Sequence, residues 1–323
     1  MSAARLSAVI LAAGKGTRLK TEQPKVLHEV CGRPMLAYVI DACRAAGVQQ
    51  CVVVVGHGKD EVIRAFADDP DITWVEQNPQ HGTGHAAMVC RPELEGRFDD
   101  VLVLCGDGPL IRSETLRELL ERHLAEDCAA TLATAVLEDP GSYGRIWRDS
   151  DGQLRGIVEF GDANAQQRAI REINPSYYCF KLADLLAALE QVKPNNVKNE
   201  YYITDALAIL IGAGRRVQAL TAVPPEDVFS INSRQDLALV NRVMRDRIMA
   251  RLMSAGVTIV DPANTWIDDR ATIGADTVVY PFTYISGPAR VGRACRIGPF
   301  ALLSGAAAIP DHGTGAPCLG SFS

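Results

Sequence analysis

The sequence predicts an α/β fold, in which a Rossmann-like, mostly parallel sheet carries helices on both faces. A connecting helix and a short hexapeptide-repeat β-helix should follow it. Two observations predict this fold. Apolar strand-like runs alternate with amphipathic helical patterns through the first half of the chain, and aliphatic residues recur every six positions near its end. A content of 47% hydrophobic and 22% charged residues over 323 positions is typical of a globular protein.

The first half reads as buried parallel strands separated by helices. The predicted strands are Leu6–Ala12, Cys51–Val55 and Val101–Leu104. The predicted helices are Pro34–Ala46, Thr83–Arg91 and one that begins at Ser113, with Leu116, Leu119, Leu120 and Leu124 on one face. Ligands of such sheets bind beyond the carboxyl ends of the strands, so the turns after Ala12 and Leu104 are the expected site.

The middle of the chain predicts further strands at 130–136 and 154–160 and helices at 181–190 and 204–211. We interpret it as a lid or substrate-specificity part of the same domain. Ser233 and Asp236 then resemble a capping box at the start of a long connecting helix. The predicted domains are therefore 1–232, a connecting helix at 233–256, a β-helix at 257–310, and a disordered tail at 311–323.

The six-residue repeat is typical of a parallel β-helix, in which one aliphatic side chain per short strand points inward. The repeat positions are Ile267, Ile273, Val279, Ile285, Val291, Ile297, Leu303 and Ile309, and glycines follow three of them. Ordinary alternating strands are the rival interpretation, because six is a multiple of two.

Charge and composition exclude several classes of function. A net charge of -6 argues against general nucleic-acid binding, and apolar runs such as Cys51–Val55 are too short to span a membrane. The first residues lead directly into a strand, so we expect no signal peptide. The nine cysteines include no CxxC pair, which favours the reduced cytoplasm. His81 and His85 are the only histidines spaced i,i+4, and we interpret them as ordinary loop and helix residues.

A glycine-containing turn is the strongest chemical feature. It reads LAAGKGTRL from Leu11 to Leu19, and QPKVL follows from Gln23. Backbone N–H groups around Gly14 and Gly16 can cradle phosphate oxygens, while Arg18 and Lys25 supply positive charge. A dinucleotide fingerprint needs a third glycine where Leu19 stands, and a Walker A motif is absent. A purely structural turn is the remaining alternative.

The turn resembles the G-x-G-T-R…P-K signature of the sugar nucleotidylyltransferase superfamily. The form LAAGKGTR is similar to the bifunctional N-acetylglucosamine-1-phosphate uridylyltransferase/glucosamine-1-phosphate acetyltransferase family. Supporting segments follow in the family's order and extend the resemblance over residues 6 to 310. They are EQNPQHGTGHA from Glu76, GDGPLI from Gly106, YGRI from Tyr143, GIVE from Gly156, EIN from Glu172, NEYYITD from Asn199 and INSR from Ile231.

The resemblance implies a set of site residues. The residues expected to bind the nucleotide are Leu11, Ala12, Ala13, Gly14, Gln77, Gly82, Thr83, Cys105 and Gly106. Gln77, Gly82 and Thr83 should recognise uracil. Without the resemblance, Gln77 would be interpreted as an exposed loop residue. The residues expected to hold the sugar are Gly144, Glu159, Asn174 and Asn232, with Tyr201 and Thr204 shaping the same pocket. Arg18 and Lys25 should be catalytic.

Asp107 and Asn232 should hold Mg²⁺, as the resemblance implies. Asp107 follows a buried strand and suits an oxygen-loving cation, although it could instead cap the turn before Pro109. Asn232 could simply precede a helix cap at Ser233. The implied reaction transfers a uridylyl group from UTP to N-acetylglucosamine 1-phosphate, in the cytoplasm, for bacterial envelope polymers. Another nucleotide or hexose 1-phosphate, a hexapeptide-type acyltransferase and a non-catalytic trimeric scaffold are the alternatives.

The sequence departs from the family in two respects. The family's left-handed β-helix is much longer and carries the acetyltransferase residues beyond the last position here, so we expect no acetyl transfer. The short β-helix could still form a homotrimer, as the resemblance implies. Cys105 stands where the family usually has an aromatic residue, and Gly108 replaces a typical aliphatic one. Both changes could loosen the packing of the nucleotide.

Overall fold

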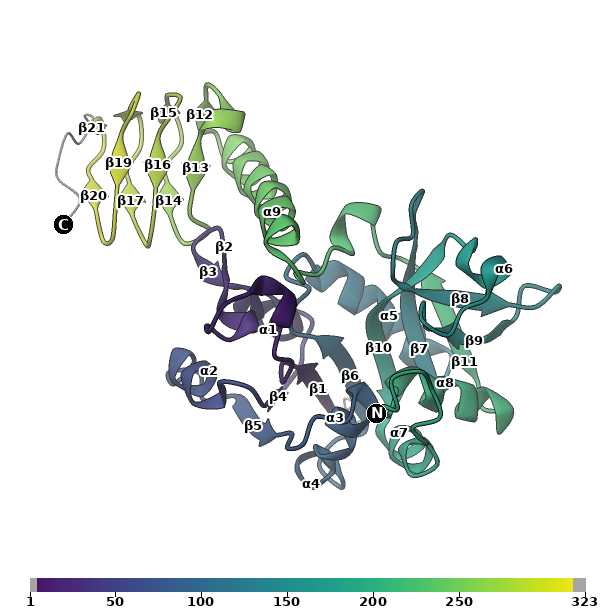
Figure 1. The fold of residues 1–323 in the computed structure, drawn as a ribbon. Coiled ribbons are helices and arrows are strands. Elements are labelled where there is room, and N and C mark those ends of the chain that lie inside the picture. The colour runs from purple at the N-terminus through teal and green to yellow at the C-terminus, as the bar shows by residue number, and fades with distance from the viewer. Residues whose placement is uncertain (1–4, 316–323) are drawn as a thin grey trace. The chain divides into compact units, whose positions relative to one another are not determined.

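The computed structural model describes residues 5–315 and divides the chain into two compact units. Within the described residues, the first unit contains residues 5–27 and 35–232, and the second contains residues 28–34 and 233–315 (Figure 1). The membership of residues 28–34 was not indicated by any local pattern in the sequence.

A nine-stranded sheet is the centre of the first unit, and seven of its strands run in the order β11-β7-β10-β6-β1-β4-β5. Strand β8 pairs with β10, and β9 pairs with β8. Pairing is parallel along β6-β1-β4-β5 and between β11 and β7, whereas β10 runs antiparallel to both of its path neighbours. The bounds are β1 Leu6–Leu11, β4 Gln50–Val55, β5 Ile72–Glu76, β6 Asp100–Cys105, β7 Ala130–Val136, β8 Gly144–Arg148, β9 Leu154–Val158, β10 Glu172–Lys181 and β11 Val217–Thr221.

Helices cover both faces of this sheet, as predicted (Figure 1). Alternate valines such as Val9 and Val103 pack against Ala86, Leu185 and Leu207 of α3, α7 and α8. Helices α1 and α5 contact each other and cover the other face. The bounds are α1 Met35–Ala45, α2 Lys59–Ala65, α3 Thr83–Met88, α4 Arg91–Leu94, α5 Ser113–Ala125, α6 Ala165–Arg168, α7 Leu182–Leu189 and α8 Ile203–Gly212. Burial of both strand faces explains the continuous apolar runs.

Three details of the predicted helices were wrong. The helix predicted at 83–91 ends at Met88, and α4 begins at Arg91 with Pro92 in its first turn. Proline has no backbone N–H to continue a preceding helix, which accounts for the break. Leu124 is 52% exposed, so it does not share the buried face of α5. Pro34 belongs to a short strand, and α1 begins at Met35.

The second unit contains a two-stranded hairpin, a long helix and a β-helix. The hairpin strands are β2 (Glu29–Val30) and β3 (Arg33–Pro34), and the helix is α9 (Arg234–Ser254). The predicted capping box is confirmed, because Ser233 Oγ accepts from Asp236 N at 3.2 Å and Asp236 Oδ2 accepts from Ser233 N at 2.8 Å.

Short parallel strands stack into three sheets, β12-β15-β18-β21, β13-β16-β19 and β14-β17-β20. Each residue pairs with the one 18 positions later, so Ile267 pairs with Ile285 and Ile285 with Leu303. Alternating antiparallel hairpins cannot produce this register, and the predicted β-helix is confirmed. The bounds are β12 Thr258–Ile259, β13 Trp266–Ile267, β14 Thr272–Ile273, β15 Val278–Val279, β16 Tyr284–Ile285, β17 Arg290–Val291, β18 Arg296–Ile297, β19 Leu302–Leu303, β20 Ala308–Ile309 and β21 Thr314–Gly315.

The predicted disordered tail begins too early. Thr314–Gly315 forms β21 and pairs with β18, so residues 311–315 extend the β-helix. The remainder of the predicted tail, 316–323, lies outside the described residues.

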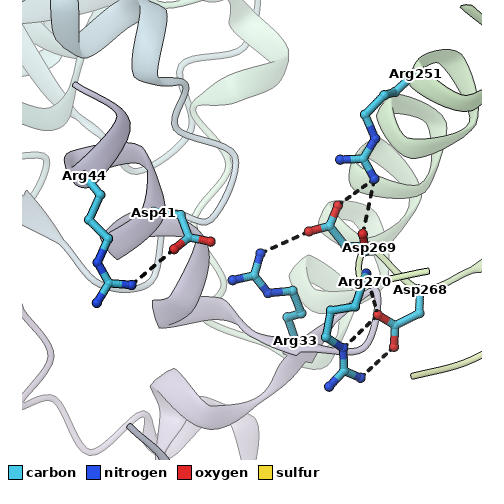
Figure 2. A network of polar contacts seen from close by, with 7 residues as sticks. All are labelled: Arg33, Asp41, Arg44, Arg251, Asp268, Asp269 and Arg270. Carbon is cyan, nitrogen blue, oxygen red and sulfur yellow. Dashed lines mark hydrogen bonds and ion pairs between the residues drawn. The ribbon is translucent and has the colours of Figure 1, made fainter. Parts of the chain in front are cut away.

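Asp269 binds residues 28–34 within the second unit (Figure 2), and its neighbour Asp268 lies close to Gly32. Asp269 pairs with Arg33 at 3.0 Å and with Arg251 of α9 at 3.1 Å. Asp268 accepts from Arg270 at 2.7 Å and from the backbone N–H of Gly287 at 2.8 Å. A Cβ atom on Gly32 would lie 1.8 Å from Asp268 Oδ2, and its φ of +84° also favours glycine. Figure 2 also draws the Asp41–Arg44 pair of α1, which belongs to the first unit.

Candidate active site

The turns after β1 and β6 lie at the same edge of the sheet. The two strands are parallel neighbours, with Leu11 paired to Cys105. The N–H of Gly106 donates to the carbonyl of Leu11 at 3.0 Å, which continues the pairing into the turns. A Cβ atom at position 106 would lie 3.2 Å from that carbonyl, so glycine permits the close approach. The strand register therefore places the two turns of the predicted site side by side.

The two glycines of the first turn differ in their surroundings. Gly16 has a φ of +63°, and a Cβ atom there would lie 2.8 Å from Cβ of Lys25. Gly16 therefore lets the turn pass close to Lys25. Apart from Gly14 and its two chain neighbours, no residue of the described chain has a heavy atom within 4 Å of a Cβ placed on Gly14. Packing does not require glycine at position 14, and the space beside its backbone is open.

Four polar side chains form one hydrogen-bonded cluster beyond the strand ends. Lys25 Nζ lies 2.5 Å from Asp107 Oδ2 and 2.8 Å from Asn232 Oδ1. Arg18 donates to the same Asn232 oxygen at 2.9 Å. Lys25 and Asp107 are 11% and 22% exposed at their side chains, so their interaction is only partly screened by water. With two cations and one carboxylate, the cluster keeps positive charge for a phosphate group.

The backbone explains how residue 232 reaches a residue 125 positions earlier in the chain. The N–H of Ile231 donates to the carbonyl of Asp107 at 2.9 Å, and Ile231 is fully buried. The carboxylate of Asp107 meets Lys25, which places it in the cluster instead of on the turn before Pro109. The structure thus brings together Arg18, Lys25, Asp107 and Asn232, although their roles remain predictions.

The oxygens of Asp107 and Asn232 suit a hard cation. Both already converge on one ammonium group, that of Lys25, and carboxylate and amide oxygens are ligands of Mg²⁺. Residues 5–315 contain no group of three or more His, Cys, Asp or Glu side chains that could enclose a metal ion. Two protein oxygens fit Mg²⁺ if phosphates of a ligand and water complete its shell, which is the usual arrangement for this ion.

The predicted sugar residues Gly144, Glu159 and Asn174 also lie together. Gly144 and Asn174 are paired across β8 and β10. A Cβ atom on Gly144 would lie 3.5 Å from Glu159 Oε2 and 3.7 Å from Cβ of Asn174. The Asn174 amide is partly committed, because its Nδ2 donates to Tyr178 Oη at 2.6 Å and its Oδ1 accepts from Ser176 N at 3.0 Å. Asn174 therefore stabilises the irregular part of β10, between Ile173 and Tyr177, and also lies beside Gly144.

Glu159 sits in a poorly hydrated position. Desolvation raises its pKa above the ordinary glutamate value, and the hydrogen bond from Thr204 Oγ1 at 3.3 Å opposes the rise. Nearby Asp162 and Asp205 add to the increase. A carboxyl group with few protein donors is available to accept hydroxyl groups of a ligand.

A cavity of about 170 Å³ joins the two sets of predicted residues. Its lining includes Leu11, Thr83 and Cys105 of the predicted nucleotide set and Glu159 and Thr204 of the predicted sugar pocket. Burial raises the pKa of the Cys105 thiol to about 12, with the charge of Asp107 as the second cause. Cys105 is therefore a neutral side chain between the polar cluster and the cavity. A larger cavity of about 490 Å³ shares Glu159 and Thr204 with this one.

The residues predicted to recognise uracil meet at the start of α3. Gln77 Nε2 donates to the carbonyl of Gly82 at 2.9 Å and lies 3.1 Å from Nδ1 of His85. Thr83 Oγ1 accepts from the N–H of Ile203 at 3.1 Å, so its hydroxyl also joins α3 to α8. Gly82 has a φ of +102°, and a Cβ atom there would lie 2.6 Å from the carbonyl of Tyr201. The glycine is therefore required by both conformation and space.

Some residues of this region were not predicted. Gln80 Nε2 donates to the carbonyl of Ala13 at 2.5 Å, and His85 contacts Gln77. Gln77 and Gln80 line a cavity of about 380 Å³ together with Lys15 and Gly56. The i,i+4 spacing of His81 and His85 is the only sequence signal that points to His85, and from the sequence we interpret both as ordinary loop and helix residues.

Replacing Glu159 by Gln tests the cost of its burial. A folded-state pKa above the unfolded one means that the protein loses stability as pH rises above the unfolded value. Gln can still accept from Thr204 but carries no charge. We expect Glu159→Gln to melt above the wild type at pH 8, with the difference shrinking as the pH falls toward 4.5. Differential scanning calorimetry across this range measures it.

The exposed Glu118→Gln variant of α5 is the matched control and should show no such trend. A Glu159→Gln melting difference independent of pH would contradict the burial argument.

Comparisons with known proteins show which family this chain resembles. Residues 8–199 match the MobA-like NTP transferase domain family. The bifunctional protein GlmU of Heliobacterium modesticaldum is 47% identical over 281 residues, or 87% of this chain and 61% of that protein. The protein of the same name from Pelotomaculum thermopropionicum is 47% identical over 278 residues, or 86% of this chain and 60% of that protein. The chain thus spans about three fifths of the length of these relatives.

A solved structure supports the fold of the first unit. UDP-glucose pyrophosphorylase complexed with UDP-glucose matches with a TM-score of 0.62 at 20% identity, covering 75% of this chain and 98% of that one. At this identity the likeness concerns the fold alone. The family match extends over more than half of the chain and includes the turn after β1, the α3 region and Asp107. The chain therefore belongs to the MobA-like NTP transferase family and is a relative of the bifunctional GlmU proteins.

Proposed function

We propose that this chain transfers a uridylyl group from UTP to N-acetylglucosamine 1-phosphate, giving UDP-N-acetylglucosamine and pyrophosphate with the help of Mg²⁺. The observation that carries the proposal is the cluster of Arg18, Lys25, Asp107 and Asn232 at the carboxyl edge of the sheet. It lies at the ends of the strands whose tips, Leu11 and Cys105, line the cavity shared with Glu159. The relatives named GlmU support the choice of reaction.

The residues have distinct parts in the proposed reaction. The open backbone of Leu11 to Gly14 faces the nucleotide phosphates, because no side chain of the described protein fills the space at Gly14. Gln77, Gly82 and Thr83 contact the base. Glu159 and Asn174 hold the sugar hydroxyls and acyl amide, with Gly144 leaving room beside them. Cys105 and Gly106 form the neutral floor between base and sugar sites.

The reaction needs positioning and charge neutralisation more than a covalent nucleophile. The sugar phosphate oxygen attacks the α-phosphorus of UTP as the bond to pyrophosphate breaks. Arg18 and Lys25 bind the oxygens on which negative charge grows, and they stand there before substrate arrives. When bound by Asp107 and Asn232, Mg²⁺ would neutralise phosphate charge and orient the two phosphate groups.

A substrate panel tests the assignment directly. Release of pyrophosphate should be fastest with UTP and N-acetylglucosamine 1-phosphate, and chelation of divalent metal should abolish it. Other nucleoside triphosphates and hexose 1-phosphates should react more slowly. A clear preference for dTTP or GTP, or for glucose 1-phosphate, would favour another nucleotidylyltransferase. The absence of turnover with every pair would favour a non-catalytic protein.

Substitution of Asp107 tests the metal site. We expect Asp107→Ala to lower kcat by at least about 10²-fold, which is the scale of losing one main stabiliser of the transition state. Steady-state pyrophosphate release at saturating substrates measures this loss. Asp107→Asn keeps the shape and one oxygen but removes the charge, so it should be intermediate and need more Mg²⁺ for half-maximal rate. The exposed Asp151→Ala variant is the control. A decrease of only a few-fold in Asp107→Ala would contradict the metal role.

The assembly state is a separate part of the proposal: the second unit forms a homotrimer. Phe282 and Phe300 are 56% and 64% exposed and stack at 5.2 Å, which leaves an apolar ladder on the β-helix. Light scattering after gel filtration should give about three times the chain mass of 34.9 kDa. Phe300→Asp should lower this mass, whereas Leu124→Asp in the first unit should not. A monomeric wild type would refute the trimer.

A further inference from the structure

We propose that His85 is a positioning residue, which holds the Gln77 amide with its oxygen toward the nucleotide base. The site would thereby prefer a base that carries N–H at ring position 3, as uracil does, over one with a bare nitrogen there, as in cytosine. This inference rests on the proposed function and names the residue behind its nucleotide preference. His85 was not among the predicted site residues.

The orientation of Gln77 follows from its neighbours. Its side chain is nearly buried, with 5% exposed, so the two hydrogens of its amide need acceptors within the protein. The carbonyl of Gly82 lies 2.9 Å from the amide nitrogen. A carbonyl can only accept, so the atom facing it must be the NH₂ group. The backbone of residue 82 thus supplies the first of two acceptors that orient the amide.

The second N–H of Gln77 is directed at His85. Nδ1 of His85 lies 3.1 Å from Nε2 of Gln77, and it can accept only in a neutral ring that carries its proton on Nε2. Desolvation, and secondarily the neighbouring His81 ring, lowers the pKa of His85, which favours that neutral form. His81 packs edge-on at 5.3 Å between ring centroids, and the ring of Tyr201 lies at 6.4 Å. The imidazole is therefore held in place by rings on two sides.

Only the oxygen of Gln77 then remains for a ligand. The two hydrogens of its amide are taken by Gly82 and His85, and no donor to Oε1 is found among residues 5–315. Gln77 lines the cavity of about 380 Å³ beside Lys15 and Gly56, so a base edge can reach it. Although a glutamine amide carries both donors and an acceptor, Gln77 would offer the base only its acceptor.

An acceptor at this point discriminates between pyrimidines. Uracil donates its N3–H to Gln77 Oε1, whereas cytosine would place a nitrogen lone pair against the same oxygen. A site whose polar group is left unpaired rejects the wrong ligand strongly, because desolvation is not repaid. Without the His85 acceptor, one amide N–H lacks a partner, and the amide can turn that N–H toward the base. The preference for uracil should then weaken.

The test compares UTP with CTP in the full chain. We expect the wild type to prefer UTP in kcat/KM by at least about 30-fold, and His85→Ala to reduce that ratio about tenfold, which corresponds to one hydrogen bond. His85→Asn places an oxygen near the position of Nδ1 and should restore the ratio to within about threefold of the wild type. His312→Ala, which replaces an exposed histidine of the β-helix, is the matched control.

Calorimetric titration of each protein with UTP and with CTP keeps the test independent of turnover. Binding that favours UTP and loses this preference in His85→Ala, but not in His85→Asn, supports the inference even if no catalysis is found. Equal binding of UTP and CTP by the wild type would overturn it. So would a His85→Ala variant that is weaker with both nucleotides by the same factor, because that result indicates a structural role alone.

Discussion

The parallel pairing of β1 with β6 is the constraint on which the site depends. Because Leu11 pairs with Cys105, β1 and β6 end side by side, and the turns that follow them begin at the same edge of the sheet. Gly16 allows the first turn to pass close to Lys25. The backbone hydrogen bond from Ile231 to Asp107 places Asn232, the last residue of the first unit, beside the second turn. Residues separated by more than 200 positions thereby share hydrogen bonds. A shift of one residue in this register would separate the cluster from its cavity.

In the proposed reaction, the charged groups of the cluster would exchange their binding partners. Lys25 pairs with Asp107 and Asn232, so the partly buried carboxylate has a partner of opposite charge. The same two oxygens are the ones that suit a divalent cation. The Lys25 ammonium group thus occupies the position that the proposed metal ion would take. In the proposed reaction, a nucleotide and its metal ion would supply new charge to both partners.

Much of the fold could be predicted because its signals are local. Continuous apolar runs indicated the central strands, and the six-residue spacing determined the β-helix, including the inward position of Ile285. The cluster was predicted through a resemblance, since spacing alone left Asp107 and Asn232 open. The hydrogen bond between Gln77 and His85 was not, because nothing in the residue types reveals which amide atom faces which neighbour. Leu124 was misplaced because a helical pattern does not show where the covering element ends.

The hairpin at 28–34 gives the second unit a discontinuous chain. Its Arg33 reaches Asp269, and the N–H of Cys31 donates to Asn241 of α9, so this unit draws on both ends of the polypeptide. During translation the hairpin is therefore synthesised about 200 residues before its partners. It can reach its folded contacts only after α9 and the first β-helix coils have left the ribosome. No single cut of the gene separates the two units intact. An excised fragment starting at Ser233 would expose Asp269 without its Arg33 counterion.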